Sequence, residues 1–344
     1  MTDHQAAYYT GEGQIEIRSA ESVAPTLGSV QIEVAFTGIC GTDLHIVRGA
    51  MDGRVSPPAI LGHEMAGRVA AVGEGVTGWQ PGDAATVMPL VWCGECAACR
   101  MGASHICQRL SFLGIDAAGS LQSRWTVPAA TLVSLPAGMS LRTAALAEPT
   151  AVAVHDVRRA HLAPGERAIV VGGGPIGLLV AVVARHAGAD VLLVEPNDER
   201  RALAERAGLA TLDPRERDLA GHVEEQTDGA GVEVAFEVSG AVAGINSAVH
   251  TLGPRGRLVV VAIHPTPPPV DLFRVFWREL TIVGARVYER SDFEEAVRLL
   301  SEGKVPADLL VTDVLPLSST PDAFAALEAG RAMKILIDCG GERS

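Results

Sequence analysis

Four cysteines lie close together in the first third of the chain and have the spacing of a metal site. They follow a C-x2-C-x2-C-x7-C pattern, with thiols at Cys93, Cys96, Cys99 and Cys107. Four thiolates with no open coordination position form a closed, tetrahedral zinc site that stabilises a fold. Two disulfides or an iron–sulfur cluster would use the same residues, but in a reducing compartment such a cluster more often binds a metal. We therefore predict a structural zinc lobe.

A second set of side chains combines the ligand types that a catalytic zinc ion uses. A thiol, a hydroxyl, a carboxylate and an imidazole occur within six residues, at Cys40, Thr42, Asp43 and His45. Farther along, His63 and Glu64 add an imidazole and a carboxylate. Zinc accepts such a mixture and keeps one position open when it acts on a substrate. A plainer interpretation of the first segment is also open, with Cys40 as a buried apolar thiol and His45 as a solvated turn residue.

A glycine-rich turn in the second half of the chain has the pattern of a dinucleotide site. The apolar run 169–171 predicts a buried strand, and an apolar helical pattern follows the turn as far as His186. The G-x-G-x-x-G residues between them are Gly172, Gly174 and Gly177, with Pro175 and Ile176 inside the motif. Glycines at these places allow a tight turn, close approach of a pyrophosphate and close packing of the helix.

The residue that should read the ribose of this nucleotide is also present. A second apolar strand, 191–194, ends on Glu195, 23 residues after Gly172. A carboxylate there accepts hydrogen bonds from the adenosine ribose and repels the 2′-phosphate of NADP. Arg200, five residues on, is expected on the adenosine side, although an arginine can also bind a phosphate. Strand, turn, helix, strand and acid together predict a site for NAD.

The elements that position these residues fall into two regions. The chain has 344 residues, enough for two domains. Short alternating runs between Gln14 and Val34, with frequent turn residues after them, predict a β-rich domain over 1–150. From about residue 151, helices alternate with short apolar strands, which predicts an α/β domain with a doubly wound parallel sheet over 151–294. We assign 295–344 to the first domain, because the terminal run Lys334–Asp338 can pair back onto it as a strand.

Composition excludes several other classes of function. The net charge of −13 disfavours binding to nucleic acid or to anionic membranes. The first residues lack the pattern of a signal peptide, and the most apolar stretch, 168–184, is interrupted by three glycines and a proline. We therefore expect a cytoplasmic protein with a small-molecule substrate.

The motifs occur in the order found in the zinc-dependent medium-chain dehydrogenases, and the chain resembles that family from end to end. The resemblance implies a GroES-like β-rich catalytic domain with a structural zinc lobe, joined to a Rossmann domain that binds NAD. It also implies two zinc ions per chain. By this resemblance Cys40 and His63 are catalytic zinc ligands, and Glu64 lies against or on the metal.

One departure from ordinary alcohol dehydrogenases indicates the branch of the family. Where those enzymes have a cysteine, this chain has Glu148 followed by Pro149, as in dehydrogenases of polyols, vicinal diols and threonine. The resemblance implies that Glu148 is an acid ligand and that the substrate is a secondary alcohol oxidised with NAD. L-Threonine 3-dehydrogenase activity is the alternative within the branch. Helix capping is the purely structural role open to Glu148, because it precedes a helical pattern in an otherwise apolar run.

The remaining site residues have expected roles in the oxidation of the alcohol. Zinc acts as a Lewis acid on the substrate hydroxyl, Thr42 relays the proton through the cofactor ribose, and His45 releases it, while Asp43 braces the segment. Ile46, Trp92 and Phe112 are candidates for an apolar substrate pocket. Further cofactor contacts are expected at the carboxyl ends of the later strands, at Val238, Ser239, Ala262 and Val287.

Two other classes of protein remain as alternatives. A reductase of the same fold without catalytic metal would have no need of Cys40, His63 or Glu148. A zinc- and nucleotide-binding protein without activity would tolerate the cysteine lobe but would not need Thr42 and His45. The resemblance further implies a homo-oligomer, with a tetramer favoured over a dimer.

Overall fold

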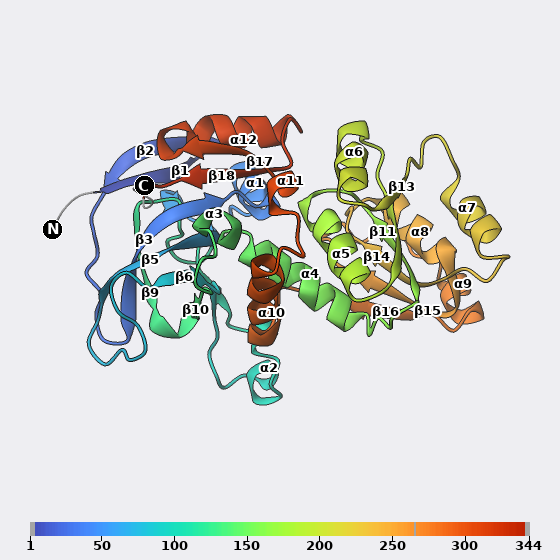
Figure 1. The fold of residues 1–344 in the computed structure, drawn as a ribbon, viewed down its shortest axis with the longest axis horizontal. Coiled ribbons are helices and arrows are strands. Elements are labelled where there is room, and N and C mark those ends of the chain that lie inside the picture. Colours follow the sequence, from blue (N-terminus) through green and yellow to red (C-terminus); the bar gives the residue numbers. More distant parts are fainter. Residues whose placement is uncertain (1–3, 265, 341–344) are drawn as a thin grey trace. The chain divides into compact units, whose positions relative to one another are not determined.

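The computed structural model describes residues 4–264 and 266–340, which form two compact units. Unit 1 comprises Met1–Glu148, Glu289–Gly303 and Leu310–Ser344, and unit 2 comprises Pro149–Tyr288 and Lys304–Leu309. Figure 1 shows the elements of both units. The sequence analysis placed 1–150 and 295–344 in one domain and 151–294 in another, whereas Lys304–Leu309 here belong to unit 2.

Unit 1 is built mainly from antiparallel strands, as the alternating pattern predicted. Its strands are β1 (His4–Gly11), β2 (Gln14–Ala20), β3 (Ser29–Gly38), β4 (Ala59–Ile60), β5 (Glu64–Val72), β6 (Ala84–Val87), β7 (Leu90–Val91), β8 (Ser111–Phe112), β9 (Arg124–Pro128), β10 (Leu132–Ser134), β17 (Val311–Pro316) and β18 (Lys334–Asp338). Its helices are α1 (Gly41–Val47), α2 (Ala97–Arg100), α3 (Leu141–Ala144), α10 (Arg290–Ser301) and α12 (Thr320–Glu328), with 3-10 turns at Ser104–Ile106, Ala129–Thr131 and Leu317–Ser319.

The central strand of unit 1 is β3, which brings the functional segments together. Its main sheet has the order β10-β6-β5-β3-β18-β17, and β9 also pairs with β3. Gly38, at the end of β3, lies opposite Glu64 on one side and Leu336 on the other. The prediction that the terminal strand pairs back onto the first domain is confirmed, because β18 is antiparallel to β3. Three segments distant in sequence, at the end of β3 and the starts of β5 and β18, therefore meet at one place.

Unit 2 is a doubly wound parallel sheet, as predicted. Its strands are β11 (Arg167–Val171), β12 (Asp190–Val194), β13 (Ala210–Leu212), β14 (Val232–Glu237), β15 (Leu252–Val260) and β16 (Thr281–Gly284). Its helices are α5 (Pro175–His186), α6 (Asp198–Arg206), α7 (Leu219–Gln226), α8 (Val242–Thr251) and α9 (Leu272–Trp277), while α4 (Ala147–Arg159) and α11 (Ala307–Leu310) run across unit boundaries.

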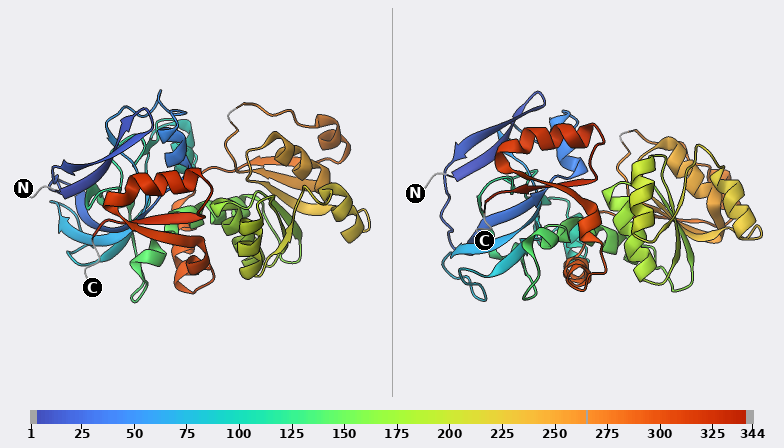
Figure 2. Two further views of the ribbon diagram at one scale, coloured as in Figure 1. Left: turned by 90° about the horizontal axis from the view of Figure 1, so that it is seen from above. Right: turned by 45° about the horizontal axis from the view of Figure 1, so that its top comes forward.

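The strand order in unit 2 is β13-β12-β11-β14-β15-β16, which is the 3-2-1-4-5-6 order of a Rossmann sheet. In Figure 2 the yellow-green helices α5 and α6 lie on one face of this sheet and the gold helices α7 and α8 on the other. The order reverses between β11 and β14, so the loops after these two strands flank the crevice in which such sheets bind nucleotides.

Strand β15 includes Gly253, Pro254 and Gly256, residue types that are typical of a turn. In the structure β15 begins at Leu252, and its pairing with β14 shifts register between Val232 and Val234. The turn residues therefore form an irregularity within the strand, where Arg255 has a φ of 60°.

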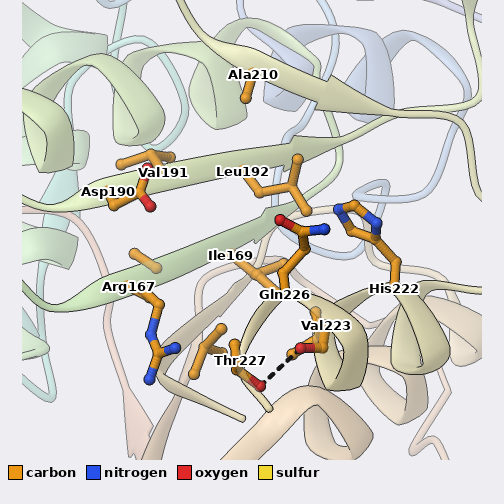
Figure 3. Close-up of a pocket in the computed structure, with 12 residues that line it drawn as sticks. Arg167, Ile169, Asp190, Val191, Leu192, Ala210, His222, Val223, Gln226 and Thr227 are labelled. Atoms are coloured by element: carbon orange, nitrogen blue, oxygen red, sulfur yellow. Dashed lines mark hydrogen bonds between the residues drawn. The ribbon is translucent and has the colours of Figure 1, made fainter. Parts of the chain in front are cut away.

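A hollow of about 170 Å³ lies at the amino ends of β11, β12 and β14. Figure 3 shows its largely apolar floor, with the side chains of His222 and Gln226 directed toward it from α7. Gly172 follows the carboxyl end of β11, so the hollow is at the opposite end of the sheet from the glycine turn. It is therefore distinct from the predicted nucleotide site. Among the described helices, none combines the length and apolarity needed to span a lipid bilayer.

Candidate active site

Helix α1 and its N-cap residue Cys40 carry a group of the predicted site residues, and a reciprocal cap fixes the start of the helix. The thiol of Cys40 accepts a hydrogen bond from the Thr42 N–H at 3.5 Å, and the Asp43 carboxylate accepts one from the Cys40 N–H at 2.9 Å. Asp43 is fully buried and His45 is exposed. The cap fixes the direction of the Cys40 sulfur at the end of β3.

The structure brings Cys40, His63 and Glu64 together. One potential ligand atom of each lies within 4.8 Å of those of the other two. His63 and Glu64 reach this place because they stand at the start of β5, directly beside the end of β3. A thiolate, an imidazole and a carboxylate this close are a ligand set that zinc binds.

The surroundings of His63 favour a metal on one of its ring nitrogens. Its Nδ1 faces Oδ1 of Asp43 at 3.6 Å, and both atoms are buried without a hydrogen-bond partner among the described residues. Burial works against a charged imidazole, but the carboxylate of Asp43 and the thiol of Cys40 raise the pKa of His63 well above its usual value. A zinc ion on Nε2 would replace that extra positive charge and leave Nδ1–H to donate to Asp43. The donor set and these two unpartnered atoms therefore fit a zinc ion.

Lys334 also belongs to this cluster, and the sequence analysis missed it. Its Nζ is buried at the start of β18 and donates to both carboxylate oxygens of Glu64, at 2.8 and 2.7 Å, and to the carbonyl of Ile39 at 3.1 Å. Burial opposes the ammonium charge, yet the nearby carboxylate of Glu64 raises the pKa of Lys334. A lysine at the start of an apolar strand was the available signal, because a buried ammonium requires a carboxylate partner.

Glu148 stands in the first turn of α4 and is buried. Its charge contributes to raising the pKa of both His63 and Lys334. Glu148 is thus electrostatically part of the same group as the residues at the ends of β3, β5 and β18. Its position in the first turn also matches the structural role that the sequence left open.

The four cysteines of the lobe form a compact cluster with free thiols. Four of their sulfur–sulfur distances lie between 3.4 and 3.9 Å. Four sulfurs at a Zn–S distance of about 2.3 Å would be about 3.8 Å apart in a tetrahedron, far longer than a disulfide bond.

Backbone N–H groups lower the pKa of Cys93 to about 6, while burial and neighbouring sulfurs raise that of Cys99 to about 12. Opposite shifts in neighbouring thiols mean that all four ionise together only around a cation, and the lobe fits a structural zinc ion.

The glycine turn has the geometry that its sequence indicates. Gly172 has a φ of 107°, and a Cβ on it would lie 2.9 Å from the backbone of Ser239. A Cβ on Gly177 would lie 1.8 Å from the carbonyl oxygen of Gly172, so α5 packs directly on the turn. A Cβ on Gly174, at the N-terminus of α5, would meet no described atom within 4 Å. Space and free N–H groups at this helix end suit a pyrophosphate.

Glu195 lies against the same turn. Its side chain is buried and accepts from the N–H of Gly173 at 2.6 Å and from the N–H of Asn197 at 2.8 Å. Arg200 approaches it loosely, with 3.9 Å between Nη1 and Oε2. Arg201 instead pairs with Asp198 and Asp213 and serves the fold of unit 2.

The later cofactor candidates occupy the loops at the carboxyl ends of the parallel strands. Val238 and Ser239 follow β14, Ala262 follows β15, and Val287 follows β16 with a φ of 49°. Sequence analysis missed Glu237, whose buried carboxylate organises one of these loops. It accepts from the N–H and hydroxyl of Ser239 and lies 2.9 Å from Nε2 of His264.

The three residues predicted to line an apolar substrate pocket differ in burial and in their contacts. The Phe112 ring meets the His63 ring edge-on, with 5.2 Å between centroids. Ile46 is buried on α1, whereas 40% of Trp92 is exposed. Of the three, only Phe112 has a described ring contact with a predicted zinc ligand.

Comparisons with known proteins place this geometry in a family. Residues 26–137 match the family model of the alcohol dehydrogenase GroES-like domain, and residues 175–302 match that of the zinc-binding dehydrogenases.

Three curated relatives cover the chain almost completely. A 2-dehydro-3-deoxy-L-galactonate 5-dehydrogenase of Pseudoalteromonas atlantica is 48% identical over 98% of this chain and 99% of its own. A sorbitol dehydrogenase of Halalkalibacterium halodurans is 34% identical, over 95% and 96%. An L-threonine 3-dehydrogenase of Pyrococcus horikoshii is 34% identical, over 93% and 94%.

Solved structures agree with these relatives. The 2R,3R-butanediol dehydrogenase of Bacillus subtilis superimposes with a TM-score of 0.91, at 32% identity and 97% and 99% coverage. A zinc-binding dehydrogenase from Sinorhizobium meliloti, bound to NADP, gives a TM-score of 0.92, at 28% identity and 98% and 100% coverage. The chain belongs to the zinc-dependent medium-chain dehydrogenases and is an alcohol oxidoreductase of that family.

Proposed function

We propose that this enzyme oxidises a secondary hydroxyl group of an open-chain polyhydroxy compound with NAD. The observation that carries the proposal is the convergence of Cys40, His63 and Glu64 within 4.8 Å. We assign the catalytic zinc ion to Cys40 and His63, with Glu64 and Glu148 as the acid residues that would complete the site. When bound there, zinc supplies the Lewis acidity that makes a substrate hydroxyl easier to deprotonate. The second zinc ion belongs to the four-cysteine lobe.

The residues of α1 would carry the proton away. Thr42 and His45 are three residues apart, so their side chains share one face of the helix. Thr42 is half-buried and His45 is exposed. The Thr42 hydroxyl can both accept and donate a proton on the path from the substrate oxygen, and the His45 imidazole can release it to solvent. Asp43, bonded to the backbone of Cys40, holds the segment in place.

The cofactor is NAD in this proposal, and Glu195 supports it. Its carboxylate is fixed beside the glycine turn by two backbone N–H groups. A 2′-phosphate placed next to it would be disfavoured roughly 10²-fold in affinity. Arg200 lies 3.9 Å from this carboxylate and fits the adenosine side.

The cofactor assignment is tested by kcat/KM for NAD and NADP on one substrate. We expect wild type to prefer NAD by about 10²-fold and Glu195→Ala to narrow that preference to within about tenfold. Glu205→Ala is the matched control, because it removes a carboxylate on α6 that accepts from Thr211 rather than from the glycine turn. A wild-type preference for NADP would contradict the assignment.

L-Threonine 3-dehydrogenase activity is the second candidate. The same zinc residues and Glu148–Pro149 would serve it, and a relative of that name is 34% identical. The relative named for a sugar acid is 48% identical over nearly the whole chain, which favours the polyhydroxy substrate.

We further propose a homo-oligomer, with a tetramer favoured over a dimer. Large apolar side chains on α9 are between 67% and 75% exposed: Leu272, Phe273, Phe276 and Trp277. Strand β16 is an edge of the parallel sheet and exposes Ile282. Exposed apolar surface beside an open edge strand suits association with another chain.

The free thiols of all six cysteines support a reducing, cytoplasmic location.

A panel of substrates assayed by NADH production tests the proposal. It should contain aldonates, sorbitol, 2,3-butanediol and L-threonine. We expect the enzyme to oxidise the polyhydroxy compounds. Only the zinc-loaded protein should show this turnover. Zinc-loaded protein that oxidises L-threonine alone would support the second candidate, and one that binds NAD but oxidises nothing in the panel would contradict both.

A further inference from the structure

We infer that Arg54 binds a carboxylate group of the substrate, which makes open-chain sugar acids the substrate class of this enzyme. The inference rests on the proposed function and specifies which polyhydroxy compounds the site selects. It is carried by the connection of Arg54 to the segment that packs on His63.

The turn 112–117 lies directly against the predicted zinc ligand. A Cβ on Gly114 would be 2.2 Å from the carbonyl oxygen of Gly62 and 3.2 Å from Cβ of His63. The Phe112 ring contacts the His63 ring edge-on. Asp116 closes this turn, because its Oδ2 accepts from the Phe112 N–H at 2.8 Å. A group bound to Asp116 is therefore connected, through the 112–117 turn, to the residues that pack against His63.

Arg54 is bound to that carboxylate in a bidentate pair. Its Nε lies 2.7 Å from Oδ1 of Asp116 and its Nη2 lies 2.6 Å from Oδ2. A guanidinium group has five N–H donors, and this pair uses two of them. No described residue accepts from Nη1 of Arg54, and 39% of the side chain is exposed. Asp116 thus fixes the orientation of a cation that still has donors to offer.

The charges around the zinc site indicate why a substrate carboxylate would need Arg54. The chain carries a net charge of −13, and the zinc-site group includes the carboxylates of Asp43, Glu64 and Glu148. A carboxylate substrate needs hydrogen-bond donors here, and the three donors of buried Lys334 are taken by Glu64 and by the Ile39 carbonyl. An arginine with free, oriented donors is the side chain best suited to a carboxylate.

Arg48 is the other arginine that follows α1, and it provides a matched control. Its Nε bonds to Glu328, and 51% of its side chain is exposed. Glu328 ends α12, a helix that contacts β2, β17 and β18 rather than the turn beside His63. Arg48 and Arg54 thus have the same charge and similar exposure, but only Arg54 is bound to the turn beside His63.

The experiment compares zinc-loaded wild type, Arg54→Gln and Arg48→Gln on acid and neutral substrates. The acids are L-galactonate and 2-dehydro-3-deoxy-L-galactonate, and the neutral compounds are galactitol and sorbitol. We expect Arg54→Gln to raise KM for the acids about 10- to 100-fold, with kcat/KM for the neutral compounds within about twofold of wild type. Arg48→Gln should change neither the KM for the acids nor the kcat/KM for the neutral compounds. Arg54→Lys should bring the KM for the acids part of the way back to the wild-type value.

Equal losses on acid and neutral substrates would overturn the inference, because they would mean that Arg54 only ties its loop to the turn. Unchanged KM for the acids in Arg54→Gln would also overturn it. Wild type that oxidises the neutral compounds but no acid would refute the carboxylate site and leave the proposed function standing. If wild type oxidises none of them, the proposed function fails. Equilibrium binding of L-galactonate to wild type, Arg54→Gln and Arg48→Gln then tests the carboxylate site by itself. Binding weakened only in Arg54→Gln supports the site, and equal binding refutes it.

Discussion

At the scale of single residues, the site depends on buried charges that are paired with one another. Lys334 and Glu64 neutralise each other at the junction of β3, β5 and β18, while Asp43 faces His63. A buried ion pair contributes little net stability, but an unpaired member of such a pair is strongly destabilising. These pairs therefore fix where a metal ligand points more than they hold the fold together.

The first prediction concerns Lys334. Lys334→Met leaves the Glu64 carboxylate buried without its partner, so we expect a loss of about 3–5 kcal/mol in the free energy of unfolding, measured in urea. Lys334→Met combined with Glu64→Gln removes both charges and should recover most of that loss. If the single variant were as stable as the double variant, the pair would not have the role assigned to it.

The second prediction concerns Asp43. Asp43→Asn keeps an oxygen that can accept from the Cys40 N–H, but it removes the charge facing His63. We expect the affinity of the catalytic site for zinc to fall by about 10- to 100-fold, as outer-shell substitutions typically do. Competition with a chelator measures this affinity. Wild-type affinity in Asp43→Asn would show that the carboxylate only caps α1.

At the scale of elements, local patterns were predictable and long-range pairs were not. The helix 175–186 and the turn before it follow from glycine spacing and apolar periodicity within one segment, and α5 has those bounds. The partners Lys334 and Glu64 are 270 residues apart, so no local pattern connects them. Glu237 was missed for a related reason, because His264 reaches it only after β15 returns to the sheet.

The third prediction concerns the cysteine lobe as an element. A closed structural site contributes its binding free energy to folding, so Cys96→Ser should lower the midpoint of thermal unfolding and the yield of folded protein. Cys339→Ser is the control, because Cys339 is a buried thiol outside the lobe. A Cys96→Ser protein with wild-type thermal stability would mean that the lobe holds no structural metal.

At the scale of the whole molecule, the two units carry different sets of predicted site residues. Unit 1 contains the predicted zinc ligands Cys40 and His63 together with Arg54, and unit 2 contains the glycine turn and Glu195. The sequence predicted both units because their periodicities differ, one alternating and the other helical between short strands. It did not predict the substrate class, since Arg54 acquires its place only through the turn that folds onto His63.

The central claim is that alcohol oxidation depends on a zinc ion bound at Cys40 and His63. The most direct test measures zinc per chain, thermal stability and turnover of one substrate in wild type and Cys40→Ser. We predict close to two zinc ions in wild type and close to one in Cys40→Ser, which should stay folded and lose turnover, because the lobe keeps its own metal. A Cys40→Ser protein that retained both zinc ions and wild-type turnover would contradict the account.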